Sequence, residues 1–362
     1  MLKSPVCRTL ALFFVLIIVS MIWTTANSHD EWEAVKTYRK LLFFFALFGL
    51  GMTLAEYKQK LLGALFLGSF CSALCCICVY IGVPGFPEMD PYQGAIFMKN
   101  HITQGFILGL LLLTGVYVFF KAEAVALKSM GIVAAFLAVY VSFYLINGRT
   151  GFLSVGVAIL SLVLFLPNSL KQRAFALLIV AACSITVLLT SDRFQDRFLQ
   201  GTQEIQQYAN VQQPHRQTTS MGLRMLYLER GINIVSKAPL FGHGVGSWPN
   251  QFDQDQFDEG IQKDDDLYQG SGNPHNDYIL IATQVGLVGL LLWFAFLGPV
   301  FNQARRMPRI DFFLLSGVLG MYCAGSFFNS FTYDVTEGTL LFLISGIVTG
   351  TTFKYTTTDS NS

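Results

Sequence analysis

Charged residues are scarce in this sequence of 362 residues. Asp, Glu, Lys and Arg make up 13% of the chain, whereas soluble proteins carry roughly 25%. Hydrophobic residues account for 53%, and Phe alone occurs 33 times. The net charge is +1, and no Lys and Arg cluster is interleaved with aromatic residues, so nothing indicates nucleic-acid binding. The composition therefore predicts an integral membrane protein.

Ten stretches are apolar enough to be membrane spans, which need about 20 mostly apolar residues each. They lie at residues 7–26, 40–57, 61–83, 103–120, 129–147, 150–166, 173–191, 276–300, 311–331 and 338–353. The alternating pattern of barrel strands is absent, and a backbone in lipid must satisfy its own hydrogen bonds, so the spans are predicted to be helices. The expected fold is an all-α integral membrane protein with about ten transmembrane helices.

The chain is expected to have four parts. Residues 1–191 hold the N-terminal transmembrane helices, 192–275 form one large and partly helical loop, 276–354 hold the C-terminal transmembrane helices, and 355–362 form a disordered tail. In the large loop, 192–208 and 221–237 are predicted to be helices, with Ser220 as the cap of the second one. The Gln-rich residues between these two helices are expected to be mobile.

Lys and Arg are unevenly distributed between the two sets of short connections. Twelve lie in one set and five in the other, and the remaining seven lie in the large loop, which is left out because long loops cross membranes largely regardless of charge. The set of twelve is predicted to be cytoplasmic, with both chain ends, and the large loop is expected outside the cytoplasm. Lys3 and Arg8 before the first apolar run leave a cleaved signal peptide as an alternative, and we favour an uncleaved span.

The large loop has no cysteine, which excludes a disulfide framework there. Cys71, Cys75 and Cys78 share one face of a predicted helix, and we favour packing over a metal site because no His or carboxylate accompanies them. The acidic run from Asp253 to Asp266 lacks the ligand spacing of a calcium loop, so a solvated acidic face is favoured over a cation site.

Two arginines are candidates for binding an anion. Arg149 lies between two predicted spans, where an ionisable residue is costly and often functional, although a side chain that merely reaches the headgroups is the alternative. Arg224 lies on the predicted helix 221–237 without a carboxylate three or four residues away. A guanidinium binds phosphate oxygens two at a time and stays charged, so two of them suit a diphosphate.

His275 is the candidate base, because it opens a predicted span at the end of the large loop and an imidazole accepts a proton near neutral pH. Asn276 or Asp277 is expected to orient it, and a histidine that only lies at the interface is the alternative. Arg230 and His243 are weaker candidates for substrate binding. Arg230 shares the apolar face of its helix, and His243 lies between glycines in a tight turn.

These residues together resemble the O-antigen ligase/polymerase family of polytopic bacterial inner-membrane proteins. The resembling segments are 147–151, 222–224 with 237–246, and 274–278 with 286–289, and the segment 94–101 is a weaker fourth one. The resemblance covers roughly residues 90–300 and does not separate ligases from polymerases. Members of the family often have about twelve spans, which is more than the ten predicted here.

The resemblance implies a function. A ligase of this family moves a glycan from an undecaprenyl diphosphate carrier to a sugar hydroxyl of lipid A-core in lipopolysaccharide biosynthesis, at the periplasmic side of the inner membrane and without a metal or a nucleotide-sugar cofactor. By this analogy Arg149 and Arg224 hold the diphosphate and His275 activates the acceptor. A polymerase that joins lipid-linked repeats is one alternative, and a transporter or flippase is another, although no broken or repeated span pair is evident.

Overall fold

The computed structural model describes residues 3–210, 219–263 and 268–359. The regular elements in these residues are helices, which make up 77% of the described residues, and no strand is present in the part described. The prediction of an all-α polytopic membrane protein is therefore confirmed. The predicted mobile segment between the two loop helices lies largely outside the described residues.

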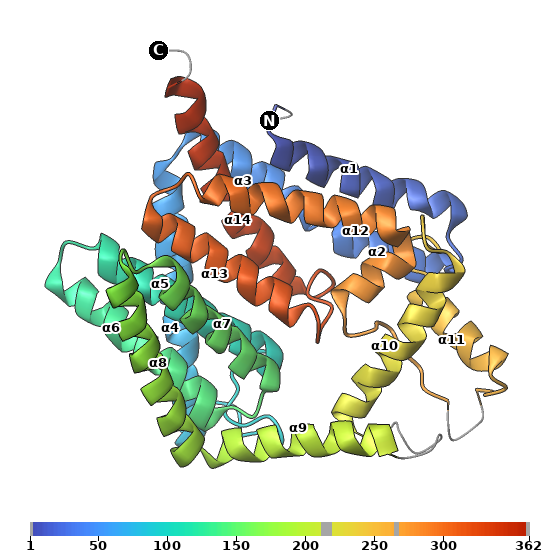
Figure 1. Cartoon of the computed structure of the whole chain (residues 1–362), viewed down its shortest axis with the longest axis horizontal. Coiled ribbons are helices and arrows are strands. Elements are labelled where there is room, and N and C mark those ends of the chain that lie inside the picture. Colours follow the sequence, from blue (N-terminus) through green and yellow to red (C-terminus); the bar gives the residue numbers. More distant parts are fainter. Residues whose placement is uncertain (1–2, 211–218, 264–267, 360–362) are drawn as a thin grey trace. The chain divides into compact units, whose positions relative to one another are not determined.

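The helices follow one another along the chain in this order (Figure 1). They are α1 (Pro5–Val19), η1 (Ser20–Trp23), α2 (Ser28–Tyr38), α3 (Leu41–Thr53), α4 (Glu56–Tyr80), α5 (His101–Lys121), α6 (Val125–Tyr140), η2 (Val141–Leu145), α7 (Arg149–Phe165), α8 (Leu170–Thr190), α9 (Asp192–Asn210), α10 (Ser220–Lys237), α11 (Trp248–Asp258), α12 (Asp277–Ala304), α13 (Arg309–Gly325) and α14 (Val335–Asp359). Each of the ten predicted spans coincides with one of these helices. The last helix extends into the tail that was predicted to be disordered, and residues 360–362 lie outside the described part.

Seven helices of the described chain are long and apolar enough to cross a membrane. They are Pro5–Trp23, Glu56–Tyr80, His101–Lys121, Val125–Leu145, Leu170–Thr190, Asp277–Ala304 and Val335–Lys354. The other three predicted spans form α3, α7 and α13, which have 13, 17 and 17 residues. Prolines shorten two of them, because Pro167 follows α7 and Pro308 precedes α13.

The chain divides into two compact units. Unit 1 comprises residues 1–46, 201–300 and 326–343, and unit 2 comprises residues 47–200, 301–325 and 344–362. Arg224, Arg230, His243 and His275 belong to unit 1. Arg149 belongs to unit 2.

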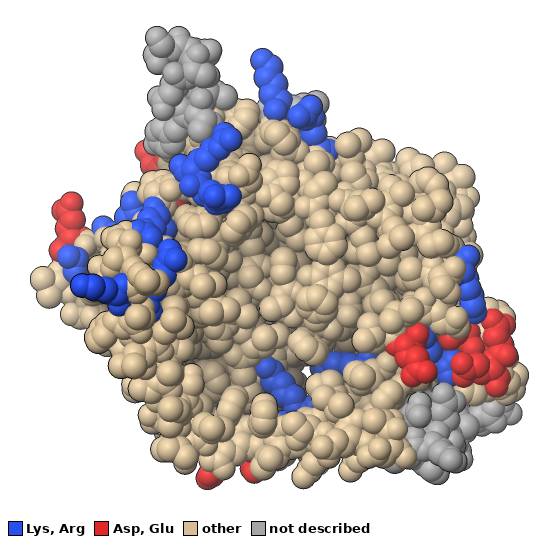
Figure 2. Space-filling view, in the orientation of Figure 1, with Lys and Arg blue, Asp and Glu red and all other residues tan. Residues whose placement is uncertain are grey.

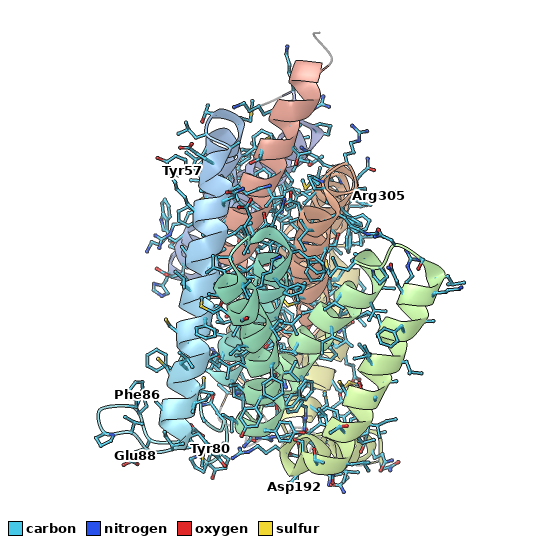
Figure 3. All side chains as sticks on the ribbon, turned by 90° about the vertical axis from the view of Figure 1, so that its left-hand side faces the viewer. Tyr57, Tyr80, Phe86, Glu88, Asp192 and Arg305 are labelled. Atoms are coloured by element: carbon cyan, nitrogen blue, oxygen red, sulfur yellow. The ribbon has the colours of Figure 1, made fainter. Side chains whose placement is uncertain are left out.

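Glycines bring the helices of unit 2 close together. A Cβ on Gly105 of α5 would lie 2.2 Å from the Cα of Gly151 on α7, and one on Gly109 would lie 3.3 Å from the backbone of Ser154. This small-residue spacing is typical of helices that pack in a membrane. Figure 3 shows α4 running from Tyr57 to Tyr80 through this unit.

Unit 1 contains two packed regions. Phe13 of α1 packs against Trp293 of α12 with ring centroids 5.3 Å apart. In the large loop, Tyr227 and Ile234 of α10 pack against Trp248 and Phe252 of α11 in one buried cluster. Figure 2 shows almost no charge over α1 and α12, whereas acidic residues gather over α11. The first surface suits lipid and the second suits water.

The two predicted loop helices are present as α9 and α10. The predicted cap of α10 is wrong by one residue. The Thr219 hydroxyl accepts a hydrogen bond from the N–H of Gly222 at 3.0 Å, whereas the Ser220 hydroxyl accepts one from the Arg224 guanidinium at 2.6 Å. Two adjacent hydroxyl residues compete for a cap position in the sequence, and only the backbone conformation distinguishes them.

Candidate functional site

His275 has an unusual backbone conformation. Its φ is +49°, and it is the one residue other than glycine with a positive φ in the described ranges. Histidine tolerates this left-handed region better than bulky residues do. The side chain of Asn273 favours the turn, because its oxygen accepts a hydrogen bond from the His275 N–H at 2.8 Å. Such conformations concentrate at functional sites.

The His275 imidazole lies against an aromatic ring and near a cation. It stacks on Tyr227 with ring centroids 6.0 Å apart and planes at 23°. The side chain remains exposed, but the protein against one ring face removes water from it. This desolvation and then the charge of Arg224 lower the pKa of His275. No residue of the described chain forms a hydrogen bond with the ring, so a neutral imidazole is available to an incoming hydroxyl.

Arg224 projects from α10 and is half-buried. Its Nε donates to the carbonyl of Phe328 at 3.2 Å, and one terminal nitrogen donates to Ser220. These contacts hold the guanidinium against α10 and the backbone of residue 328. Unit 1 therefore brings Arg224 and His275 together, since the charge of Arg224 acts on the imidazole.

Asn276 and Asp277 do not have the predicted role of orienting the imidazole. The Asn276 side-chain oxygen caps α12 by accepting from the N–H groups of Tyr278 and Ile279, and its nitrogen donates to the carbonyl of Phe327. The carboxylate of Asp277 is fully buried and accepts from the Ser326 hydroxyl and the Thr332 N–H. Both side chains bind residues 326–334, which we call the connecting segment because it joins α13 to α14.

The glycine-rich turn at residues 239–246 fills a break in α12. Gly286 has non-helical angles, with φ 66° and ψ −167°. The carbonyls of Thr283 and Gln284, which the break leaves without helical partners, accept from the N–H groups of His243 and Gly244 at 2.8 and 2.9 Å. A backbone inside a membrane protein must be satisfied in this way. The expectation that no span is broken is therefore wrong, although turn contacts seal the break.

His243 takes part in this turn rather than in the arrangement around His275. Its ring Nε2 lies 3.0 Å from the carbonyl of Ile234, and its own carbonyl accepts from the N–H of Thr25. These contacts tie the turn to the end of α10 and to the start of the chain. His243 therefore has a structural role in the turn.

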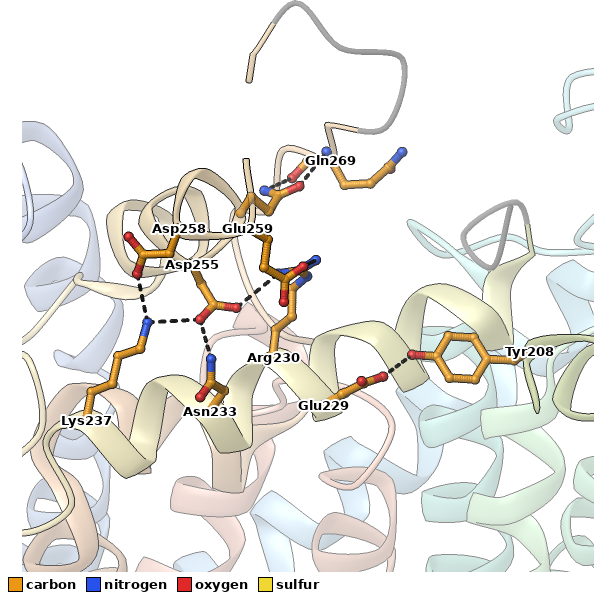
Figure 4. A network of polar contacts seen from close by, with 10 residues as sticks. Tyr208, Glu229, Arg230, Asn233, Lys237, Asp255, Asp258, Glu259 and Gln269 are labelled. Atoms are coloured by element: carbon orange, nitrogen blue, oxygen red, sulfur yellow. Dashed lines mark hydrogen bonds and ion pairs between the residues drawn. The ribbon is translucent and has the colours of Figure 1, made fainter. Parts of the chain in front are cut away.

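Arg230 is 5% exposed and is held by two carboxylates (Figure 4). Its guanidinium lies 3.1 Å from Asp255 and 2.7 Å from Glu259, and Asp255 also accepts from Asn233 and Lys237. The network ties α10 to α11. A guanidinium that is buried and paired in this way has little capacity for a second anion, so we place Arg230 in the scaffold.

Arg149 begins α7 in unit 2, beside two other arginines. Its Nε donates to the carbonyl of Arg197 at 3.1 Å, and Arg193 donates to the side chain of Asn147 at 2.7 Å. The weaker segment 94–101 is adjacent, because His101 packs on Gly148. The sequence reasoning missed Arg193 and Arg197. The one available signal was their i, i+4 spacing at the start of α9.

Within the described ranges, no group of three His, Cys, Asp or Glu side chains has the arrangement of a metal site. The acidic run 253–266 is described only up to residue 263, since residues 264–267 lie outside the described part. Its described members at Asp255 and Glu259 form the ion pairs with Arg230.

Residues 132–294 match the O-antigen ligase family. The predicted resemblance is therefore confirmed at the level of the family, and the match includes Arg149, Arg224 and His275. The matched residues run from within α6 through α7, α8 and the large loop to most of α12.

Two further proteins are similar. An uncharacterized protein of Haemophilus influenzae is 26% identical over 185 residues, which cover 49% of this chain and 44% of that protein. The chain thus spans less than half the length of this curated relative. A solved structure described as "Structural coordination of polymerization and crosslinking by a peptidoglycan synthase complex" covers 94% of this chain and 96% of its own, with 16% identity and a TM-score of 0.45.

Proposed function

We propose that this protein is an O-antigen ligase-like glycosyltransferase. It moves a glycan from undecaprenyl diphosphate to a sugar hydroxyl of lipid A-core. The acceptor hydroxyl attacks the anomeric carbon, the bond from that carbon to the diphosphate oxygen breaks, and the carrier leaves with the electron pair. His275 receives the hydroxyl proton. The observation that carries the proposal is the exposed His275 imidazole, with its lowered pKa, beside Arg224.

His275 suits the part of the general base. A base is most effective when its pKa lies near the working pH and its nitrogen is accessible to the proton. The pKa below the ordinary value of 6.5 keeps the ring neutral at pH 7. Arg224 also opposes formation of the imidazolium, so the proton is released again once the product has left.

Arg224 and Arg149 suit the diphosphate. Arg224 is held by Ser220 and the Phe328 carbonyl, so its orientation is fixed before a substrate binds. Arg149 lies near Arg193 and Arg197, because it donates to the carbonyl of Arg197 and Arg193 donates to Asn147. Fixed cations aimed at a leaving group where charge develops are the largest source of catalysis in many enzymes. We propose one phosphate-binding role for each site.

The charge distribution supports an active site in the periplasm. In unit 2, Tyr57 and Arg305 lie at one end of the helices, and Glu88 and Asp192 lie at the other end (Figure 3). The first end carries Lys58 and Lys60 and suits the cytoplasm. Asp192, where the large loop begins, is then periplasmic. We therefore propose an inner-membrane protein whose active site faces the periplasm.

The lipopolysaccharide of a strain that lacks the gene tests this proposal on a gel. The proposal predicts core without O-antigen and an accumulation of lipid-linked glycan. Core that bears a single repeat indicates a polymerase instead. An unchanged profile contradicts both functions and leaves the transporter alternative, for which the break in α12 is the one supporting observation.

A further inference from the structure

The connecting segment 326–334 contacts both parts of the proposed site. The carbonyl of Phe328 accepts from Arg224, and the carbonyl of Phe327 accepts from Asn276, the neighbour of His275. We propose that Asp277 and Lys40 are positioning residues, which hold the connecting segment and thereby fix Arg224 relative to His275. This inference rests on the proposed function.

Asp277 holds the start and the middle of the segment. Its N–H donates to the carbonyl of Ser326 at 2.9 Å, and its Oδ2 accepts from the Ser326 hydroxyl at 2.9 Å. Both carboxylate oxygens lie within 3.0 Å of the N–H of Thr332. A charged acceptor strengthens each of these bonds, and a fully buried carboxylate has no competing water. Residues 326 and 332 are therefore fixed to the first turn of α12, two residues after His275.

Lys40 holds the far end of the segment. It is 5% exposed, and its Nζ donates to the carbonyl of Asp334 at 2.8 Å. The charges of Asp334, Asp277 and Glu337 act on Lys40, so its ammonium compensates buried carboxylates around the segment.

Stability alone does not account for these buried charges. Ion pairs in a protein interior often contribute no more than apolar side chains of the same volume, because both partners lose water. The arrangement does specify one geometry, since the carboxylate, the ammonium and the two carbonyls that receive Arg224 and Asn276 are joined by a single short segment. A positioning role follows from this connectivity.

The test uses His275 as a reporter in the full-length purified protein. The pKa of its imidazole is measured by NMR with labelled histidine, and His275→Gln identifies the signal. In Asp277→Asn a side-chain NH2 replaces one of the two carboxylate oxygens that lie near the Thr332 N–H, so two donors face each other. The segment then loosens, and the pKa of His275 is expected to rise toward 6.5. Loss of a nearby negative charge would by itself lower this pKa, so the sign separates repositioning from a direct charge effect.

Activity gives the second readout. In Asp277→Asn we expect kcat for glycan transfer to fall by about tenfold or more with little change in KM, because a displaced base affects the transition state. Asp311→Asn is the matched control, since Asp311 is also a buried carboxylate, 3.1 Å from Lys58 in unit 2. It should leave the pKa of His275 unchanged. If Asp277→Asn does not fold, Ser326→Ala removes one bond of the same group without a change in charge, and the same but smaller shift is expected.

An unchanged or lowered pKa of His275 in the folded variant overturns the positioning role. A change in KM without a fall in kcat overturns it as well. If the wild-type protein transfers no glycan, the proposed function fails, whereas the pKa measurement still decides whether Asp277 positions the Arg224–His275 pair.

Discussion

Substitutions of His275 separate its chemistry from its backbone conformation. Because its φ is +49°, any L-residue here adopts a left-handed conformation, which costs about 1–2 kcal/mol outside glycine and asparagine. His275→Asn keeps a residue type that tolerates this region but cannot act as a base near neutral pH. His275→Gly removes the conformational cost, and His275→Ala keeps it.

The expected stabilities follow from one contact and from the conformation of the backbone. Each variant loses the stacking on Tyr227, which contributes about 0.5–1.5 kcal/mol. In His275→Gly the relief of strain offsets this loss and the higher entropy of glycine in the unfolded chain, of about 0.4–1 kcal/mol. We expect the free energy of unfolding of His275→Gly to lie within about 1 kcal/mol of wild type and above that of His275→Ala, where only the stacking changes.

The activity follows a different order. All three variants lack the base, so the rate of glycan transfer is expected to fall by about 10²–10⁴-fold in each, irrespective of stability. The assay is transfer from lipid-linked glycan to lipid A-core by purified protein, with thermal unfolding measured in the same detergent. His29→Gln, at an exposed histidine of α2, is the control and should retain wild-type rates. High activity in His275→Asn refutes the base role and leaves His275 as a residue that shapes the turn.

Four further predictions concern the other parts of the account. In a pH profile, kcat/KM should rise through an apparent pKa below 6.5 as His275 loses its proton. The stability contributed by the neutral ring should be complete above pH 6.5 and should decline as the pH falls. An activity profile that is flat between pH 5 and 7 contradicts this. Arg224→Lys should lose about 10–100-fold in rate at normal protein levels, because lysine keeps the charge but not the planar fork, and wild-type rates in this variant would reduce Arg224 to a general source of charge. Gly286→Ala should prevent accumulation of folded protein, measured by size-exclusion chromatography, because its φ is +66° and a Cβ would lie 2.2 Å from a backbone carbonyl oxygen of the turn; a well-folded variant would show that the break in α12 is not required. In a chain without native cysteines, Gln207→Cys should react with an impermeant thiol reagent in intact spheroplasts and Lys171→Cys should react only after lysis, and the reverse pattern would invert the topology.

The helices were predictable because hydrophobicity and helix periodicity are local properties of the sequence. All ten apolar stretches are helices, and α9 and α10 lie where the loop pattern indicated. The number of full-length spans was not predictable in the same way, because Pro167 follows α7 and Pro308 precedes α13. Hydropathy averages over such positions, whereas the backbone responds to each of them.

The proposed site was predictable only in part. Arg224 and His275 were identified from residue type and from their place at the loop ends. The functions of their neighbours depend on contacts across long sequence separations, which no local pattern records. Asp277 looked like an orienting partner for His275 but binds residues 326 and 332. Arg230 was a weaker candidate for substrate binding, and the ion pairs with Asp255 and Glu259 hold it inside the loop.

The most direct test of the central claim is glycan transfer in proteoliposomes that contain only this protein, a lipid-diphosphate-linked glycan and lipid A-core. The account predicts that glycan becomes covalently attached to lipid A-core, that the lipid diphosphate is released in equal amount, and that His275→Gln abolishes both. Growth of the lipid-linked glycan without use of lipid A-core would contradict the ligase function and identify a polymerase. No reaction with either acceptor, in protein shown to be folded, would contradict the proposed glycosyltransferase activity.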